Sequence, residues 1–123
     1  MHRGLLRAFA PRANAELHPE PRPGVRGDRV QAPERYAADP QIAGVYAEVA
    51  KIPEVIDGIY CYCHCSEHHD HRSLLSCFED DHGAQCEICL AEAFGAAMMH
   101  REGASLDEIR RVIDARMNPA AVS

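Results

Sequence analysis

The chain has 123 residues, of which 46% are hydrophobic and 26% are charged, and this suits one small folded domain. It contains no run of about 18 apolar residues, so we expect no transmembrane segment. The formal net charge is −6: seven arginines against four acidic residues give residues 1–35 a charge of +3 and leave −9 for the rest. Such an acidic body argues against nucleic acid as a partner, because phosphate binding requires a basic surface.

Residues 1–35 are predicted to form a disordered arm rich in proline and arginine. They hold five of the eight prolines and show no apolar period that would predict a helix or a strand. Residues 4–10 and the sequence Ala13-Asn14-Ala15 resemble an export signal with its cleavage site, but Arg7 interrupts the apolar segment. A plain tail or a misplaced start fits these residues better. We therefore divide the chain into this arm and a cysteine- and histidine-rich helical domain over residues 36–118.

The domain is predicted to be all-α, with three to four helices and a short extended cysteine-rich segment. A first helix begins at Pro40 after an Asp39 cap, and its apolar residues recur at the spacing of a half-buried helix. One further helical turn is expected from Pro53 to Asp57. Residues 59–63 are rich in β-branched and aromatic side chains, which favours an extended segment.

Three more helices are expected after the cysteine-rich segment. A brief helix is predicted over residues 73–78, and a longer one over residues 83–101, ended by Gly103. Ser105 and Glu108 have the spacing of a capping box, which predicts that the last helix opens there. The result is a small helical bundle, with the thiol segment folded against the start of the longer helix.

The chemistry of the chain is concentrated in residues 60–89, which contain all six cysteines and five of the eight histidines. Thiolate and imidazole are ligands that transition metals favour, whereas cysteines that only filled a core would be scattered along apolar faces. The pattern therefore predicts metal binding. The cysteines follow the order Cys61-x-Cys63-x-Cys65, then Cys77, then Cys86-x-x-Cys89.

Two other chemistries use the same atoms. Six cysteines can form three disulfides in an oxidising compartment. Alternate residues of an extended segment point to the same face, however, and neighbouring thiols on one face suit a metal better than a disulfide. Cys86-x-x-Cys89 has the spacing of thiol oxidoreductases, so a redox role stays open.

Six thiols exceed the four of a closed tetrahedral zinc site, which indicates either two sites or a multinuclear cluster. Cu(I) and Zn(II) suit such donors, and an iron–sulfur centre is disfavoured because the ferredoxin spacings are missing. His82 lies close enough to Cys86 to reach the same centre, whereas a loop hydrogen bond is the alternative for His71. The candidate metal ligands are Cys61, Cys63, Cys65, Cys77, Cys86, Cys89, His82 and His71.

These cysteines belong to a longer recognisable pattern. It comprises Ile52-Pro53-Glu54-Val55-Ile56-Asp57-Gly58-Ile59-Tyr60-Cys61-Tyr62-Cys63-His64-Cys65, then His71-Arg72-Ser73-Leu74-Leu75-Ser76-Cys77-Phe78, His82 and Cys86-x-x-Cys89. The pattern resembles a family of bacterial proteins named for a PCYCGC or CYCxC motif, largely of unassigned function. Here Tyr60 replaces the proline of the motif and His64 replaces its glycine. The resemblance implies an exported, periplasmic or lipid-anchored location, although no lipidation cysteine lies near the start of this chain. Members with selenocysteine in the motif also imply a reactive chalcogen.

Together these observations predict a small binding protein that sequesters or delivers a thiophilic transition metal, Cu(I) or Zn(II). A protein that receives the ion is the expected partner. The alternative is a thiol/disulfide oxidoreductase in which Cys61, Cys63 or Cys65 attacks a substrate. We favour binding over catalysis and assign no catalytic residue, because nothing in the sequence resembles a hydrolase, a kinase or a nucleotide binder.

Overall fold

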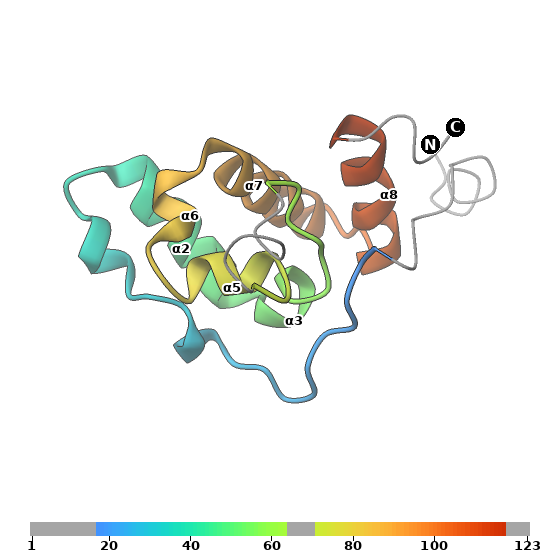
Figure 1. Cartoon of the computed structure of the whole chain (residues 1–123), viewed down its shortest axis with the longest axis horizontal. Coiled ribbons are helices and arrows are strands. Elements are labelled where there is room, and N and C mark those ends of the chain that lie inside the picture. The colour runs from blue at the N-terminus through green and yellow to red at the C-terminus, as the bar shows by residue number, and fades with distance from the viewer. Residues whose placement is uncertain (1–16, 64–70, 118–123) are drawn as a thin grey trace.

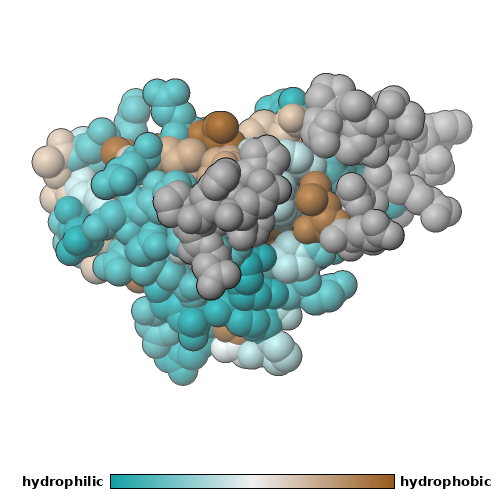
Figure 2. All heavy atoms as spheres, viewed as in Figure 1, coloured by the Kyte–Doolittle hydropathy of each residue, from teal (hydrophilic) through white to brown (hydrophobic). Residues whose placement is uncertain are grey.

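The computed structural model describes residues 17–63 and 71–117, and within these ranges it contains helices and no strand. The predicted all-α class is confirmed, and no helix in the described ranges is long and apolar enough to cross a membrane. Hydrophilic side chains form most of the described surface on the face seen in Figure 2. The helices in Figure 1 are α2 (Pro40–Lys51), α3 (Pro53–Ile56), α5 (Leu74–Phe78), α6 (His82–Gln85), α7 (Glu87–Arg101) and α8 (Leu106–Met117), preceded by the 3-10 helices η1 (Gly27–Arg29) and η2 (Pro33–Tyr36).

The predicted helix boundaries are set by local hydrogen bonds. Asp39 directly precedes Pro40, the first residue of α2. Its carboxylate accepts hydrogen bonds from two backbone amides of the first turn of this helix. At the start of α8, the Ser105 amide donates to the Glu108 carboxylate (2.8 Å) and the Glu108 amide donates to the Ser105 hydroxyl (3.1 Å), so the predicted capping box is confirmed. Gly103 ends α7 with a φ of 94°, a conformation that glycine adopts without strain.

The single helix expected over residues 83–101 is wrong in one respect, because the structure divides it at Cys86. The short helix α6 ends at Gln85, Cys86 is extended (φ −126°, ψ 111°), and α7 begins at Glu87. Cys86 is the N-cap of α7, and its carbonyl accepts the first hydrogen bond of that helix from the Leu90 amide (3.1 Å). Residues 59–63 contain a bend and a turn and pair with no strand in the described residues. The short extended segment predicted there is therefore confirmed only in part.

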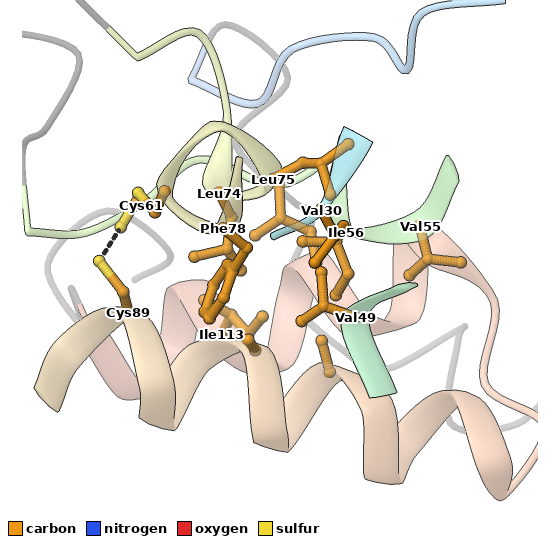
Figure 3. Close-up of a cluster of buried hydrophobic side chains, with 14 of the residues drawn as sticks. Val30, Val49, Val55, Ile56, Cys61, Leu74, Leu75, Phe78, Cys89 and Ile113 are labelled. Carbon is orange, nitrogen blue, oxygen red and sulfur yellow. Dashed lines mark hydrogen bonds between the residues drawn. The ribbon is translucent and has the colours of Figure 1, made fainter. Parts of the chain in front are cut away.

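The core lies between α2, α3, α5, α7 and α8 and is completed by aromatic side chains. Tyr46 and Phe78 are fully buried, and their rings meet edge to face with centroids 4.8 Å apart. Figure 3 shows Leu74, Phe78 and Ile113 packed together, with Cys61 and Cys89 at one end of the same cluster. The cysteine-rich segment is therefore continuous with the hydrophobic core.

The expected disordered arm needs correction for residues 17–35, which follow one edge of the domain from α8 to α2 (blue to cyan in Figure 1). His18 and Val30 are only 6% and 7% exposed. Proline removes the backbone hydrogen bonds of helices and strands, but it does not prevent side chains from docking on a folded surface. The absence of an apolar period was therefore insufficient evidence for disorder. Residues 1–16 lie outside the described part of the chain.

Asp57 is the main electrostatic anchor between the arm and the helices. Its carboxylate is fully buried and accepts hydrogen bonds from the backbone and guanidinium of Arg22 (2.8–3.0 Å), from Arg72, and from the Ser73 hydroxyl (2.7 Å). Burial raises the pKa of Asp57, but the hydrogen bonds from Arg22 and Ser73 and the charge of Arg22 outweigh it and hold the pKa below its usual range. The interaction thus stabilises the fold only while Asp57 is ionised.

We predict that Asp57→Asn lowers the free energy of unfolding by roughly 3 kcal/mol, because two guanidinium groups lose their buried negative charge and one of its two acceptor oxygens becomes an NH2 donor. A carboxylate with a depressed pKa contributes stability above its unfolded pKa of about 3.9, and that stability is lost as the pH falls through the folded pKa. Wild-type stability should therefore decline more steeply than that of Asp57→Asn below about pH 4. Urea denaturation across this pH range measures both effects. The control is Asp28→Asn, whose side chain is 68% exposed and pairs with exposed Arg26. An equal loss in this variant would contradict the role of Asp57.

Candidate metal centre

Three thiols from two distant segments meet at one end of the core. The Cys61 sulfur lies 3.0 Å from that of Cys89 and 3.3 Å from that of Cys63, and the Cys63 and Cys89 sulfurs are 3.4 Å apart. Figure 3 shows the Cys61 and Cys89 side chains directed toward each other. No disulfide joins any two of the described cysteines. The predicted convergence of the Cys61-x-Cys63 segment with Cys89 is therefore present.

The described residues contain two groups of four donors that could each hold a metal ion. In each group the donor atoms all lie within 4.8 Å of one another. The inner set consists of Cys61, Cys63, Cys77 and Cys89, and the outer set of Cys63, His82, Cys86 and Cys89. The two sets share the Cys63 and Cys89 sulfurs.

The break between α6 and α7 brings Cys86 toward Cys89. An N-cap side chain folds back over the first turn of its helix, toward the third helical position. Cys86 occupies the N-cap of α7 and Cys89 is its third residue. The two thiols therefore face the same space at the start of the helix, which is where the sequence placed them, although the backbone at Cys86 is not helical.

A glycine allows α6 to approach α5 and position His82. A Cβ atom on Gly83 would lie 2.8 Å from the Phe78 ring and 3.0 Å from the Cys77 carbonyl oxygen, so this close approach excludes a larger residue without repacking. The His82 amide donates to the Asp80 carboxylate (2.8 Å), and its Nε2 lies 3.5 Å from the Cys63 sulfur. His82 is thus placed beside Cys63 as a donor of the outer set.

His71, a predicted ligand, belongs to neither donor set. Its Nδ1 lies 3.5 Å from the Cys77 sulfur, and its Nε2 lies 3.0 Å from the Asp80 carboxylate. The His71 and His82 rings meet edge to face at 5.5 Å. A histidine held between a carboxylate and a cysteine orients the sulfur, as partners of metal ligands commonly do.

Sequence reasoning missed Glu92, which fixes the cysteine-rich turn on α7. Glu92 is only 4% exposed, and its carboxylate accepts a hydrogen bond from the Tyr62 amide (2.6 Å). Tyr62 lies between Cys61 and Cys63, so this bond holds both thiols beside Cys89. The available signal was spacing, because Glu92 follows Cys89 by three residues and shares its helix face.

Sequence reasoning also missed a buried polar cluster that ties the cysteine-rich turn to α8 and the arm. The Asp114 carboxylate accepts a hydrogen bond from the Tyr62 hydroxyl (2.6 Å) and lies 2.7 Å from His18 Nε2. The Tyr60 amide donates to His18 Nδ1 (3.1 Å), so the ring carries its proton on Nε2 and donates it to Asp114. Burial, followed by the hydrogen bond to Asp114, raises the pKa of Tyr62 well above its usual value. No local pattern marked His18 or Asp114.

Cys65, the sixth predicted thiol ligand, lies outside the described residues, as do His64, His68 and His69. Their roles stay predictions.

A groove of about 900 Å³ runs between α2 and α7 and extends to Cys86 at the start of α7. Its apolar walls include Ile42 and Val45 from α2 and Leu90 and Phe94 from α7. Cys86 lines the same groove and is partly exposed. The groove therefore reaches one residue of the outer set.

A model of a protein family, described as a protein of unknown function with PCYCGC motif, matches residues 34–120. The chain belongs to this family. No curated protein and no solved structure matches the chain. The match covers both donor sets, Glu92 and Asp114, whereas His18 and Arg22 precede it. The resemblance seen in the sequence is confirmed, and the family description itself carries no function.

We predict that Tyr62→Phe exposes the thiols of the candidate centre to modification. The variant keeps the buried ring but removes the hydroxyl from Asp114, which costs about 1–2 kcal/mol and loosens the turn that carries Cys61 and Cys63. Thiol-specific labelling under native conditions, followed by mass spectrometry, should show faster modification of Cys63.

The matched control is Ser105→Ala, which removes the capping box of α8 at a cost of about 1 kcal/mol without touching the cysteine-rich turn. Equal labelling rates in the two variants would show that the effect follows stability alone, which would contradict a specific role for Tyr62.

Proposed function

We propose that this protein binds a thiophilic transition metal, Zn(II) or Cu(I), in the inner set, in order to sequester or deliver it. The observation that carries the proposal is that four thiols from three separate segments lie within 4.8 Å of one another. Cys77 and Cys89 are fully buried and Cys61 is 4% exposed. Buried cysteines with only a packing role have no reason to gather at one point.

The spacing of the sulfurs fits a four-coordinate thiolate site. With Zn–S bonds of about 2.3 Å, the sulfurs of a tetrahedral site lie about 3.8 Å apart. The measured separations among Cys61, Cys63 and Cys89 are 3.0–3.4 Å. Each pair has to separate by less than about 1 Å, which small side-chain rotations allow without refolding the turn.

Charge favours Zn(II) over Cu(I) for this site. Four thiolates leave two uncompensated negative charges with a divalent ion and three with a monovalent ion. Uncompensated charge is costly to bury, and the Glu92 carboxylate beside Tyr62 adds further negative potential. The complex with the divalent ion therefore buries less uncompensated charge than the complex with the monovalent ion.

A thiol/disulfide oxidoreductase remains a second candidate, supported by the 3.0 Å separation of the Cys61 and Cys89 sulfurs. A modest approach would give a disulfide bond of about 2.05 Å. In such a reaction these two thiols would be oxidised while a substrate disulfide is reduced to two thiols. Of the three neighbouring thiols, Cys61 and Cys89 are buried and Cys63 is partly exposed, so Cys63 is the one best placed to meet a substrate.

Metal removal provides the first test. Protein purified without added metal should contain metal by elemental analysis. The inner-set cysteines should then be protected from thiol labelling, because they are bound to the metal. A strong chelator should then lower the Tm by roughly tens of degrees, since a structural thiolate site contributes on the order of 10 kcal/mol to folding. An unchanged melting curve after verified metal removal would contradict the proposal.

Cys77→Ser provides the second test, because Cys77 contributes only to the inner set. We expect it to weaken metal binding and to lower the Tm of the metal-loaded protein, while the metal-free variant and metal-free wild type melt at similar temperatures. Matched titrations and melting curves of both proteins measure this. Catalytic disulfide reduction by metal-free protein, lost on replacing only one of Cys61, Cys63 and Cys65, would instead establish the oxidoreductase.

A further inference from the structure

We infer that the outer set, Cys63, His82, Cys86 and Cys89, is a second metal site that shares two thiolates with the inner set, so that the centre is binuclear and its outer ion is the exchangeable one. This inference rests on the proposed function of the inner set. It assigns separate roles to two ions, one retained within the core and one available for transfer.

The geometry of a binuclear centre follows from the shared sulfurs. Cys63 and Cys89 belong to both sets and lie 3.4 Å apart, which makes them the common edge of two four-coordinate sites. The inner set completes its site with Cys61 and Cys77, and the outer set with His82 and Cys86. Thiolate sulfur can bridge two ions, so six donors suffice for two tetrahedral ions.

Electrostatics favours the second ion once the first is bound. One divalent ion among four thiolates leaves two negative charges uncompensated. A second divalent ion, bound with the Cys86 thiolate and the neutral His82 ring, leaves one negative charge for the whole centre. The partly buried cluster therefore becomes less charged as it fills, and its desolvation penalty falls.

Exposure separates the two ions functionally. The two donors that belong only to the inner set, Cys61 and Cys77, are 4% and 0% exposed. The two that belong only to the outer set, His82 and Cys86, are partly exposed, and Cys86 lines the groove between α2 and α7. A chelator or an acceptor thiol can thus reach Cys86 without unfolding the core. The outer ion should leave first.

Cadmium NMR tests the shared-thiolate geometry directly, with ¹¹³Cd(II) as the probe for a divalent thiophilic ion. The reduced full-length protein should bind two equivalents and give two resonances, one from an all-sulfur site and one from a site with three sulfurs and one nitrogen. Scalar coupling between the two cadmium nuclei is expected, because the bridging sulfurs connect them. A soluble chelator should remove one of the two equivalents and abolish the resonance of the mixed site first.

Cys86→Ser and His82→Gln should each remove the mixed-site resonance and reduce the stoichiometry from two equivalents to one. The matched control is His100→Gln, at the far end of α7 and outside both donor sets, which should leave both resonances unchanged. A single all-sulfur resonance that Cys86→Ser and His82→Gln do not affect would overturn the second site but leave the proposed function standing. Two uncoupled resonances would overturn the bridged geometry, and absence of any cadmium binding would overturn the proposed function as well.

Discussion

The hydrogen bond between the Tyr62 amide and the Glu92 carboxylate is the constraint on which the candidate centre depends. It fixes a short turn with no helical or strand bonds of its own against α7, so that the thiols on either side of Tyr62 meet Cys89. The Tyr62 hydroxyl extends the same restraint to Asp114 on α8. The turn is thereby held from two helices, which gives the sulfurs a defined separation before any ion is bound.

The arm contributes to this arrangement from the opposite end of the chain. His18 connects Asp114 with the Tyr60 amide, and Arg22 connects the arm with buried Asp57, next to the residues that lead into the cysteine-rich turn. A domain of this size has a limited hydrophobic core, so buried polar clusters and a metal centre are expected to supply a larger share of its stability. The arm, the thiol turn and the helices therefore behave as one folding unit.

The arrangement of the donors also relates binding to transfer. Sulfurs enclosed by the core retain an ion, because its release requires the protein to open, whereas donors on the wall of a groove release an ion to any ligand that enters. In the proposed binuclear centre, the shared pair of thiolates would let both behaviours occur in one small domain. The retained ion would then stabilise the fold that presents the exchangeable ion.

The sequence alone determined the helical class, the capped starts of α2 and α8, the stop at Gly103 and the cysteines that meet, because these depend on local hydrogen bonds, periodicity and residue spacing. Only the tertiary structure decided that the helix breaks at Cys86, that His71 contacts Cys77 instead of joining a donor set, and that Glu92 and Asp114 hold the turn. It also decided that residues 17–35 pack on the domain. These features join residues far apart in the chain, such as His18 and Asp114, and local sequence patterns carry no information on which buried polar groups will become partners.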